Sequence, residues 1–249
     1  MASTLLAWAT DPELRRNGTS GGFIRAMQIW MLETGVVDQV LHARTGLAGD
    51  GFFNSPHYTS TDNPLALRGR DTCSVYFPVW TGALSIDLST SYAATVLPCY
   101  MPTILLHPEI VYTFELLCHH TPNWDWSRYV AEQLGVDCKT FCAYRGNGWP
   151  GELTMDDKTV PHTRYWSNDI QKWGLPKCKH CTRVHSPDTD FVCGDPWGYK
   201  GEMGDGKTMV LAQTARAEKL LEKAIAASVI ATEPLDRAFW DKRIRNHRK

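Results

Sequence analysis

Three segments of the chain place apolar side chains at the three- and four-residue spacing of an amphipathic helix. The first follows a run of small residues, Asn17–Gly22, and stops at Gly35. The second is closed by Gly135, a residue type that commonly ends helices. We expect the first helix to have the apolar positions Phe23, Met27, Trp30 and Met31, and the second to extend over Trp124–Leu134. The third is expected over Arg216–Ala231, with its apolar face inward: Leu220, Leu221, Ile225 and Val229.

Five shorter apolar segments have the length and composition of strands. They are Val36–Leu41, Ser91–Leu97, Val111–Leu117, Glu152–Met155 and Thr208–Thr214. Helices and strands that alternate along a chain favour a mixed α/β fold. We therefore expect one mixed-sheet domain over residues 1–249, with long irregular loops.

Two segments follow neither pattern. From Thr45 to Arg70 glycine, asparagine, serine, threonine and proline dominate, which predicts a long irregular loop of the kind that often carries function. The tail from Arg237 to Lys249 is basic, and it predicts the solvated end of a C-terminal helix.

The balance of charge excludes some classes of partner. The chain of 249 residues has 26 Lys and Arg against 27 Asp and Glu, a net charge of −1. It has no overall positive field to hold a nucleic acid or an anionic membrane surface, so neither partner is expected. No apolar run approaches the ~20 residues of a membrane span. The start lacks the basic region of a secretory signal, so we expect a cytoplasmic protein.

The chain has eight cysteines. Without an export signal they are expected to be reduced, which favours metal, cluster or catalytic roles over disulfides. Cys178 and Cys181 have the spacing at which one turn directs two thiolates to one metal. Cys99 and Cys118 each follow a predicted strand, and the ends of adjacent strands converge. These four sulfurs suit a [4Fe-4S] cluster or a structural zinc ion.

A competing set of ligands uses other cysteines. Cys138 and Cys142, in place of Cys99 and Cys118, would complete a zinc site made of two pairs, and we rank this arrangement second. The choice between iron–sulfur and zinc stays open at this point, because the ligands alone do not select the metal.

The remaining thiols and two histidines have simpler interpretations. Cys73 and Cys193 are expected to be buried residues without a metal role, because free cysteine is among the most buried residue types. His119 and His120 directly follow the candidate ligand Cys118. They could be metal ligands or proton donors, and the alternative is that both are surface residues of a loop.

A glycine-containing turn, Thr19-Ser20-Gly21-Gly22, directly precedes the first predicted helix. Free backbone N–H groups and the positive end of a helix dipole would form a site for a phosphate or pyrophosphate there. An ordinary helix cap is the alternative interpretation. The common nucleotide-binding motifs, G-x-G-x-x-G and the P-loop, are absent from the sequence.

The order of short motifs from about Asp11 to Ala226 resembles the beta-subunit family of coenzyme F420 hydrogenase/dehydrogenase. The segments that carry this resemblance are Asp11–Arg16, Thr19–Gly22, Leu32–Gly35, Asp38, Pro98-Cys99, Cys118, Arg145–Gly151, Cys178–Cys181, Gly194-Asp195 and Trp197-Gly198. These motifs occur in the family's order along most of the chain, which makes this a specific signal.

The resemblance implies two bound cofactors, FAD and a [4Fe-4S] cluster, and electron transfer between a deazaflavin, the flavin and iron–sulfur partners. It implies that Ser20, Gly21 and Gly22 lie on the phosphates of FAD, and we predict the pyrophosphate at Thr19–Gly22. It also implies that Cys99, Cys118, Cys178 and Cys181 hold the cluster, the same four thiols that the spacing favours.

Two residues are assigned to the site of the redox partner, and one segment departs from the family pattern. Trp149 can offer an aromatic surface and Arg145 a cation for an anionic coenzyme tail; a core tryptophan and a solvated arginine are the alternatives. Val96-Leu97 stands where the family usually has Gly-Thr before Pro-Cys, which predicts an altered turn beside the flavin or the cluster. The chain lacks an additional ferredoxin-like cysteine motif, so at most one cluster is expected.

We predict a flavin- and iron–sulfur-dependent oxidoreductase. It would transfer hydride or electrons between a reduced coenzyme, with F420 ranked first, and a small molecule or an electron-transfer protein. A homo-oligomer is compatible with this prediction. Two alternatives remain: a zinc-stabilised binding or scaffold protein of the same fold without redox chemistry, and a flavin-dependent isomerase or epimerase.

Overall fold

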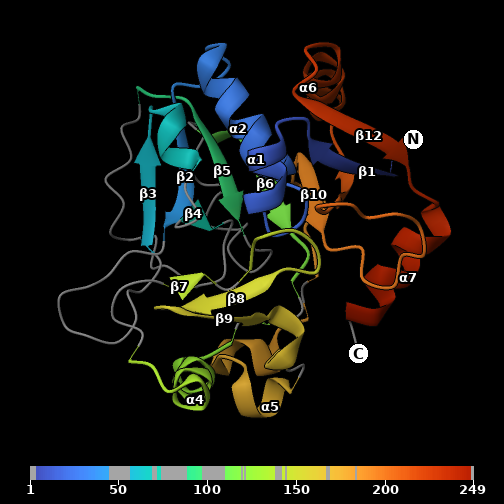
Figure 1. Ribbon diagram of the computed structural model, residues 1–249. Helices are drawn as coiled ribbons and strands as arrows, with labels where there is room; N and C mark the ends of the chain where they lie inside the picture. Colours follow the sequence, from blue (N-terminus) through green and yellow to red (C-terminus); the bar gives the residue numbers. More distant parts are fainter. Residues whose placement is uncertain are drawn as a thin grey trace.

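A large mixed sheet forms the centre of the molecule in the computed structural model (Figure 1). The structure describes residues 4–44, 57–68, 72–73, 89–96, 110–118, 120, 122–137, 142–143, 145–166, 169–182 and 184–247. Within these residues the sheet has nine strands: β1 (Thr4–Ala9), β2 (Gln39–Arg44), β3 (His57–Thr61), β4 (Thr72–Cys73), β5 (Tyr92–Val96), β6 (Ile110–Leu116), β10 (Phe191–Gly194), β11 (Thr208–Ala212) and β12 (Ile230–Pro234).

The strands lie in the order β12-β1-β11-β10-β6-β5-β2-β3, and β4 also pairs with β2. The central strands β10, β6, β5 and β2 pair in parallel, whereas the pairs at both sides are antiparallel. Parallel strands need crossover connections, usually helices, and they are generally covered on both faces. This mixed α/β fold confirms the fold class expected from the sequence.

Helices cover the two faces of the main sheet. The α-helices in the described part of the chain are α1 (Pro12–Asn17), α2 (Phe23–Glu33), α4 (Trp124–Leu134), α5 (Ile170–Trp173), α6 (Ala215–Ala226) and α7 (Arg237–His247). Side chains of α1, α2 and α6 form one buried cluster with alternate residues of the strands, such as Phe114 and Phe191. These two rings stack with centroids 4.9 Å apart, and the ring of Phe23 in α2 packs edge-on against both. The opposite face packs against α7 through Trp240.

A second, smaller sheet contains β7 (Cys142–Ala143), β8 (Glu152–Met155) and β9 (Lys158–Pro161), and it lies below the main sheet in Figure 1. Its apolar side chains pack against α4, whose Trp126 and Val130 are buried. Three short 3-10 helices complete the described elements: η1 (Pro64–Leu67), η4 (His162–Arg164) and η5 (Pro176–His180). A single domain over residues 1–249 stays a prediction.

Local capping explains where α4 begins and ends. The Asn123 side chain accepts a hydrogen bond from the backbone N–H of Trp126, at 3.1 Å. Gly135 then ends the helix in the left-handed conformation, with φ +69°. Both are established devices for helix ends, so the predicted bounds of this helix are confirmed.

The predicted helix over Arg216–Ala231 is wrong at its C-terminal end. Helix α6 ends at Ala226, Ser228 adopts φ +56°, and Ile230 begins a strand. The strand forms because β12 pairs with β1 from the other end of the chain. Within the helix Leu220 and Leu221 are buried as expected, but Ile225 is exposed.

Two expectations for irregular or solvated segments also need correction. Within Thr45–Arg70 the structure describes residues 57–68, which include β3, paired with β2, and η1; residues 45–56, 69 and 70 lie outside the described residues. The basic tail is not simply solvated, because Trp240 in α7 is 1% exposed and packs against Leu6 and Met209 of the sheet.

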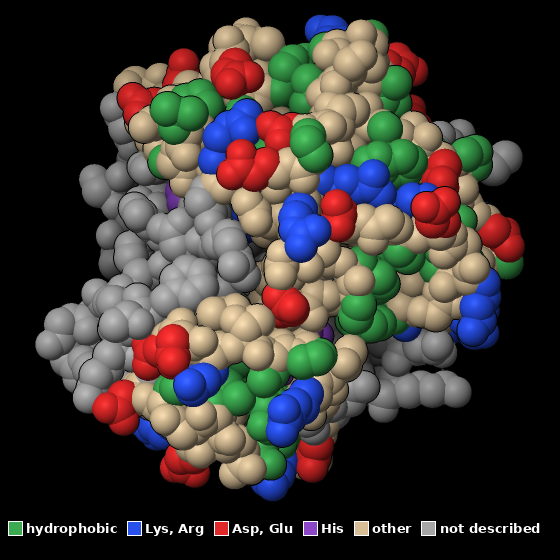
Figure 2. Space-filling view, in the orientation of Figure 1, with side chains coloured by type: hydrophobic (Ala, Val, Ile, Leu, Met, Phe, Trp, Pro, Cys, Tyr) green, Lys and Arg blue, Asp and Glu red, His purple; other side chains and the backbone are tan. Residues whose placement is uncertain are grey.

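Charge on the surface follows the composition. On the face that Figure 2 shows, basic and acidic side chains are interspersed among the described residues, in keeping with a net charge of −1. None of the helices in the described part of the chain is long and apolar enough to span a bilayer.

Candidate functional site

Arg145 joins three segments that are far apart in the sequence. Its side chain is 2% exposed and forms an ion pair with the carboxylate of Asp195. It also donates a hydrogen bond of 2.6 Å to the backbone carbonyl of Thr19, which precedes it by 126 residues. The glycine turn, the segment Arg145–Gly151 and the segment around Asp195 therefore meet at one buried guanidinium group.

Two tryptophan rings pack against this guanidinium. Its central carbon lies 5.2 Å from the ring centroid of Trp149 and 5.5 Å from that of Trp197, within the range of cation–π attraction. The two rings are 4.7 Å apart, and the indole N–H of Trp197 donates to Asp195 at 3.2 Å. We call Arg145, Trp149, His162, Asp195 and Trp197 the Arg145 cluster.

His162 is the member of the Arg145 cluster that sequence reasoning missed. It begins η4 directly after the strand β9, and the residue is 4% exposed. Burial lowers the pKa of His162 to about 3, the positive charge of Arg145 acts in the same direction, and Asp195 opposes it. The imidazole is therefore neutral at neutral pH. No motif in the sequence singles out this histidine.

This burial predicts a pH dependence of stability. The unfolded chain takes up a proton at His162 near pH 6.5, whereas the folded chain does so only near pH 3. Stability from this group is thus fully present above about pH 6.5 and is lost as the pH falls toward 3. We expect His162→Phe to flatten the fall in unfolding free energy between pH 7 and pH 4.5, measured by urea denaturation. The control Thr163→Phe, at an exposed neighbour, should keep the wild-type slope.

The glycine turn is packed tightly against the segment before β11. The Ser20 hydroxyl donates to the Lys207 carbonyl at 2.9 Å, and the Thr208 hydroxyl donates to the Ser20 carbonyl. Gly21 has φ +83°, and a Cβ there would lie 2.7 Å from the carbonyl oxygen of Gly206. The smallness of Gly21 is therefore required by the packing of the chain itself.

Gly21→Ala is expected to destabilise the fold by about 2 kcal/mol, because it adds a backbone clash to an unfavourable φ angle. Gly35→Ala is the matched control: its φ is +65°, but nothing lies within 4 Å of the added Cβ. It should cost about 1 kcal/mol, the strain alone. Thermal or urea unfolding measures both, and equal losses would show that the contact with Gly206 has no energetic weight.

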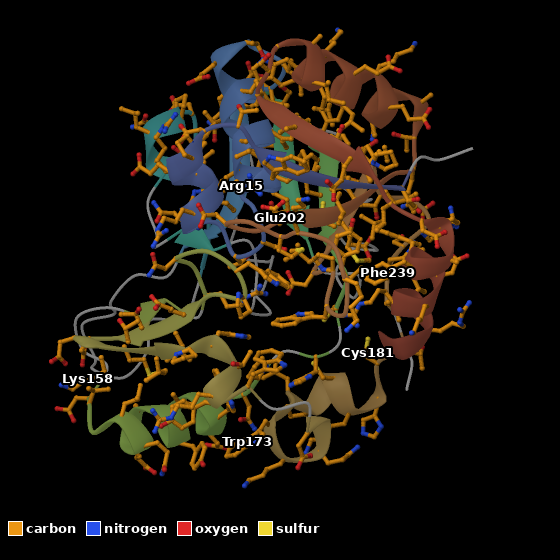
Figure 3. All side chains as sticks on the ribbon, turned by 45° about the vertical axis from the view of Figure 1, so that its right-hand side comes forward. Arg15, Lys158, Trp173, Cys181, Glu202 and Phe239 are labelled. Carbon is orange, nitrogen blue, oxygen red and sulfur yellow. The ribbon has the colours of Figure 1, made fainter. Side chains whose placement is uncertain are left out.

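The N-terminus of α2 has one property of an anion-binding site. Gly22 is the N-cap, with φ +72°, and it provides no side-chain hydrogen bond to the first turn. Such an uncapped helix start favours negative charge. Its basic neighbour Arg15 donates to the carbonyls of Gly206 and Met203, both at 3.1 Å, and lies near the segment of Glu202 in Figure 3. The binding of a phosphate by Thr19–Gly22 stays a prediction.

Three of the four predicted cluster ligands lie in the described part of the chain. Cys178 lies in η5, and Cys181, labelled in Figure 3, directly follows it. The backbone N–H of Cys181 donates to the Cys178 carbonyl at 3.3 Å, so one tight turn holds both thiols. Cys118 lies two residues after β6, and its backbone N–H donates to the carbonyl of Val184 at 3.5 Å. The chain therefore returns to the end of β6 three residues after Cys181.

Cys99 lies outside the described residues; the strand that precedes it, β5, runs parallel to β6. Within the described part of the chain, no three His, Cys, Asp or Glu side chains gather as a metal site. The donor set itself suits the implied group, because four thiolates are the usual ligands of a [4Fe-4S] cluster. The cluster ligands stay a prediction.

A buried carboxylate, Glu115, holds the segment after Cys181 against β6. The residue is fully buried, and it accepts hydrogen bonds from the backbone N–H of Ser186 at 2.8 and 2.9 Å and from the hydroxyl of Thr189. Gln213 donates to the Ser186 carbonyl at 2.9 Å. Glu115 thus fixes the loop that follows the Cys178–Cys181 pair, a role that its position inside an apolar strand did not reveal.

The other cysteines and histidines considered from the sequence have varied positions. Cys193 is fully buried in β10, and burial raises the pKa of its thiol, as expected for a residue without a metal role. His120 is also buried, with its ring 5.7 Å from that of Trp166, so a surface position is wrong for it. Cys142 begins β7 and Cys73 ends β4; Cys138 and His119 lie outside the described residues.

Comparison with known proteins places the chain in one family. Two family models describe the beta subunit of coenzyme F420 hydrogenase/dehydrogenase: residues 4–71 match the model of its N-terminal part, and residues 89–238 match that of its C-terminal part. A similar curated protein is the F420-dependent formate dehydrogenase 1 subunit beta of Methanococcus maripaludis, 24% identical over 238 residues. The alignment covers 90% of this chain and 60% of that relative, so the chain spans less than two thirds of the relative's length.

A solved structure has the same fold. A chain of the F420-reducing [NiFe] hydrogenase complex from Methanosarcina barkeri superposes with a TM-score of 0.71, at 17% sequence identity. The match covers 98% of this chain and 88% of that one. The two family models together extend from β1 to the start of α7, and they include every motif that was identified in the sequence. The chain therefore belongs to the coenzyme F420 hydrogenase/dehydrogenase beta-subunit family.

Proposed function

We propose that this chain is an FAD- and [4Fe-4S]-dependent oxidoreductase that exchanges hydride or electrons with coenzyme F420. The observation that carries the proposal is the arrangement around Arg145, which joins the predicted phosphate-binding turn at Thr19 to the tryptophans of two other family motifs. Membership of the F420 family supports the choice of coenzyme.

The residues of this chain would bind and orient the cofactors. Thr19–Gly22 and the uncapped start of α2 would receive the phosphates of FAD. Arg145 would fix that turn against Trp197, and Trp149 would offer the coenzyme a partly exposed aromatic surface. Because the charge of Arg145 is paired with Asp195, this arginine would act mainly by positioning the turn.

Thiolates would hold the iron. Cys118, Cys178 and Cys181, together with Cys99, would be the four ligands, and Glu115 would keep the loop after Cys181 in place. When bound, FAD and the cluster would supply the step from two-electron hydride chemistry to single-electron transfer. The relatives' names describe a subunit and a complex, which supports an electron-transfer protein as the partner.

The test begins with the purified protein under anaerobic conditions. An absorbance spectrum with assays of iron, sulfide, zinc and flavin should show one FAD and about four iron atoms per chain. Bound zinc without flavin would contradict the proposal and favour the scaffold alternative. Rapid mixing with reduced F420, and separately with NADH and NADPH, should bleach the flavin only with reduced F420. Bleaching by none of the three would favour a protein electron donor or the isomerase alternative.

A further inference from the structure

His162 is a buried polar residue with a nitrogen that has no hydrogen-bond partner in the described part of the chain. The residue is 4% exposed, and its Nδ1 makes no hydrogen bond with any of the described residues. Its backbone is held in place, because the N–H donates to the Gly151 carbonyl at 3.0 Å. A buried polar atom that remains without a hydrogen bond lowers stability, so such atoms usually have a partner in the working state of a protein.

The polar groups next to His162 are already engaged with each other. The carboxylate of Asp195 receives the guanidinium of Arg145 and the indole N–H of Trp197. Nδ1 of His162 has no hydrogen-bond partner among the described residues. The missing partner of Nδ1 must therefore come from outside this set of side chains.

The surroundings of His162 suit a flat, aromatic ligand. The imidazole lies 5.2 Å from the ring of Trp166, at an interplanar angle of 30°, and 6.4 Å from the ring of Trp197, at 22°. Both tryptophans are partly exposed. A neutral imidazole offers either a donor or an acceptor at Nδ1, depending on its tautomer. A planar heterocycle with carbonyl and N–H groups along one edge would therefore find a partner here.

The Arg145 cluster also connects this histidine to the predicted phosphate site. Arg145 donates to Thr19 at 2.6 Å and lies against Trp197, whose ring in turn faces His162. A ligand whose phosphate binds the glycine turn and whose ring reaches His162 would contact both ends of this series of contacts. FAD and F420 both have a phosphate group and a ring whose outer edge is a pyrimidinedione.

We propose that His162 binds the pyrimidinedione edge of the redox ring through Nδ1. This inference rests on the proposed function and adds a residue to its binding site. It concerns recognition only, and no proton or electron moves to or from His162. FAD and F420 share the recognised edge, so the experiment must distinguish which ring His162 contacts.

The experiment uses the full chain, purified anaerobically, and four variants. His162→Phe keeps an aromatic ring and removes both nitrogens, whereas His162→Asn retains a polar atom near the position of Nδ1. His162→Gln places its polar group further out and serves if the Phe variant does not fold. Thr163→Phe, at the exposed neighbour, is the matched control. The readouts are FAD per chain, the Kd of F420 from its fluorescence, and the thermal midpoint of unfolding.

We expect His162→Phe and His162→Gln to weaken the binding of one ring at least tenfold. The thermal midpoint of the Phe variant, compared with wild type on flavin-free protein, should stay the same or rise. The rise would follow because an unpaired buried nitrogen has been removed. Asn should restore most of the affinity, and Thr163→Phe should bind as wild type. Loss of FAD would identify the flavin as the ligand, and full FAD with a raised Kd for F420 would identify the deazaflavin.

Wild-type binding of both rings by the Phe or Gln variant would overturn the inference, because Nδ1 would then recognise neither ring. A lowered thermal midpoint with unchanged binding would also overturn it and assign His162 a purely structural role. The proposed function fails separately. In that case the wild-type protein itself would hold no flavin and would not bind F420.

Discussion

Iron should fall to near zero in the purified protein when serine replaces Cys178, and equally when it replaces Cys181, Cys118 or Cys99. A cluster of this type needs four thiolates, and a serine hydroxyl is a harder and far less acidic ligand. One tight turn holds both Cys178 and Cys181, so the loss of either thiol leaves that turn with a single ligand. Iron and sulfide assays on each single variant, with the visible spectrum, measure the loss.

The control for the cysteine prediction comes from the competing ligand set. Serine at Cys138 or Cys142 should leave iron at the wild-type level, because neither thiol belongs to the proposed four. Normal iron in the first four variants, with loss in these two, would instead favour the ligand set that pairs Cys138 and Cys142 with Cys178 and Cys181. Zinc is measured in the same samples, so that a change of metal is not mistaken for a loss of ligands.

Arg145→Met should lower the free energy of unfolding by about 3 kcal/mol and reduce the flavin content of the purified protein. The substitution leaves the carboxylate of Asp195 without its cation and the Thr19 carbonyl without its donor. Removing one partner of a buried ion pair costs about 3–5 kcal/mol. We place the loss at the lower end of this range, because the Asp195 side chain retains 24% exposure. Urea denaturation measures the change.

An exposed ion pair nearby serves as the matched control. Arg16 lies 3.6 Å from Asp205, and the two side chains are 56% and 46% exposed. Exposed pairs contribute about 0–1 kcal/mol, so Arg16→Met should have a small effect. The double variant Arg145→Met with Asp195→Asn should be more stable than the sum of the two single losses predicts. Additive losses would mean that the Arg145–Asp195 pair has no coupling energy.

Elements governed by local signals could be predicted from the sequence. Helix α4 and strand β8 match their predicted bounds, because capping residues and turn residues mark their ends within a few positions. Strand β1 was not predicted, and α6 was predicted too long, for one shared reason. Both errors arise from the pairing of β1 with β12, and the partners in such a pair lie at opposite ends of the chain.

The candidate site, like the fold, could be predicted from the sequence only in part. Cysteine spacing and the glycine turn are visible in the sequence, and they led to the predicted cofactors. The roles of His162 and Glu115 depend on burial and on hydrogen-bond partners, which only the folded chain defines. Arg145 and Trp149 were selected by the family motif. Their shared contact with Trp197, from a segment about 50 residues away, required the tertiary structure.

The position of β1 inside the sheet has a consequence for synthesis on the ribosome. Both neighbours of this strand, β11 and β12, are translated roughly 200 residues after it. At about 5–20 residues per second, the nascent strand waits roughly 10 to 40 s before either partner exists. Its backbone hydrogen-bonding groups are unpaired during that time, which is when unfolded strands are prone to aggregate. Expression of this chain should therefore benefit from chaperones that bind nascent chains.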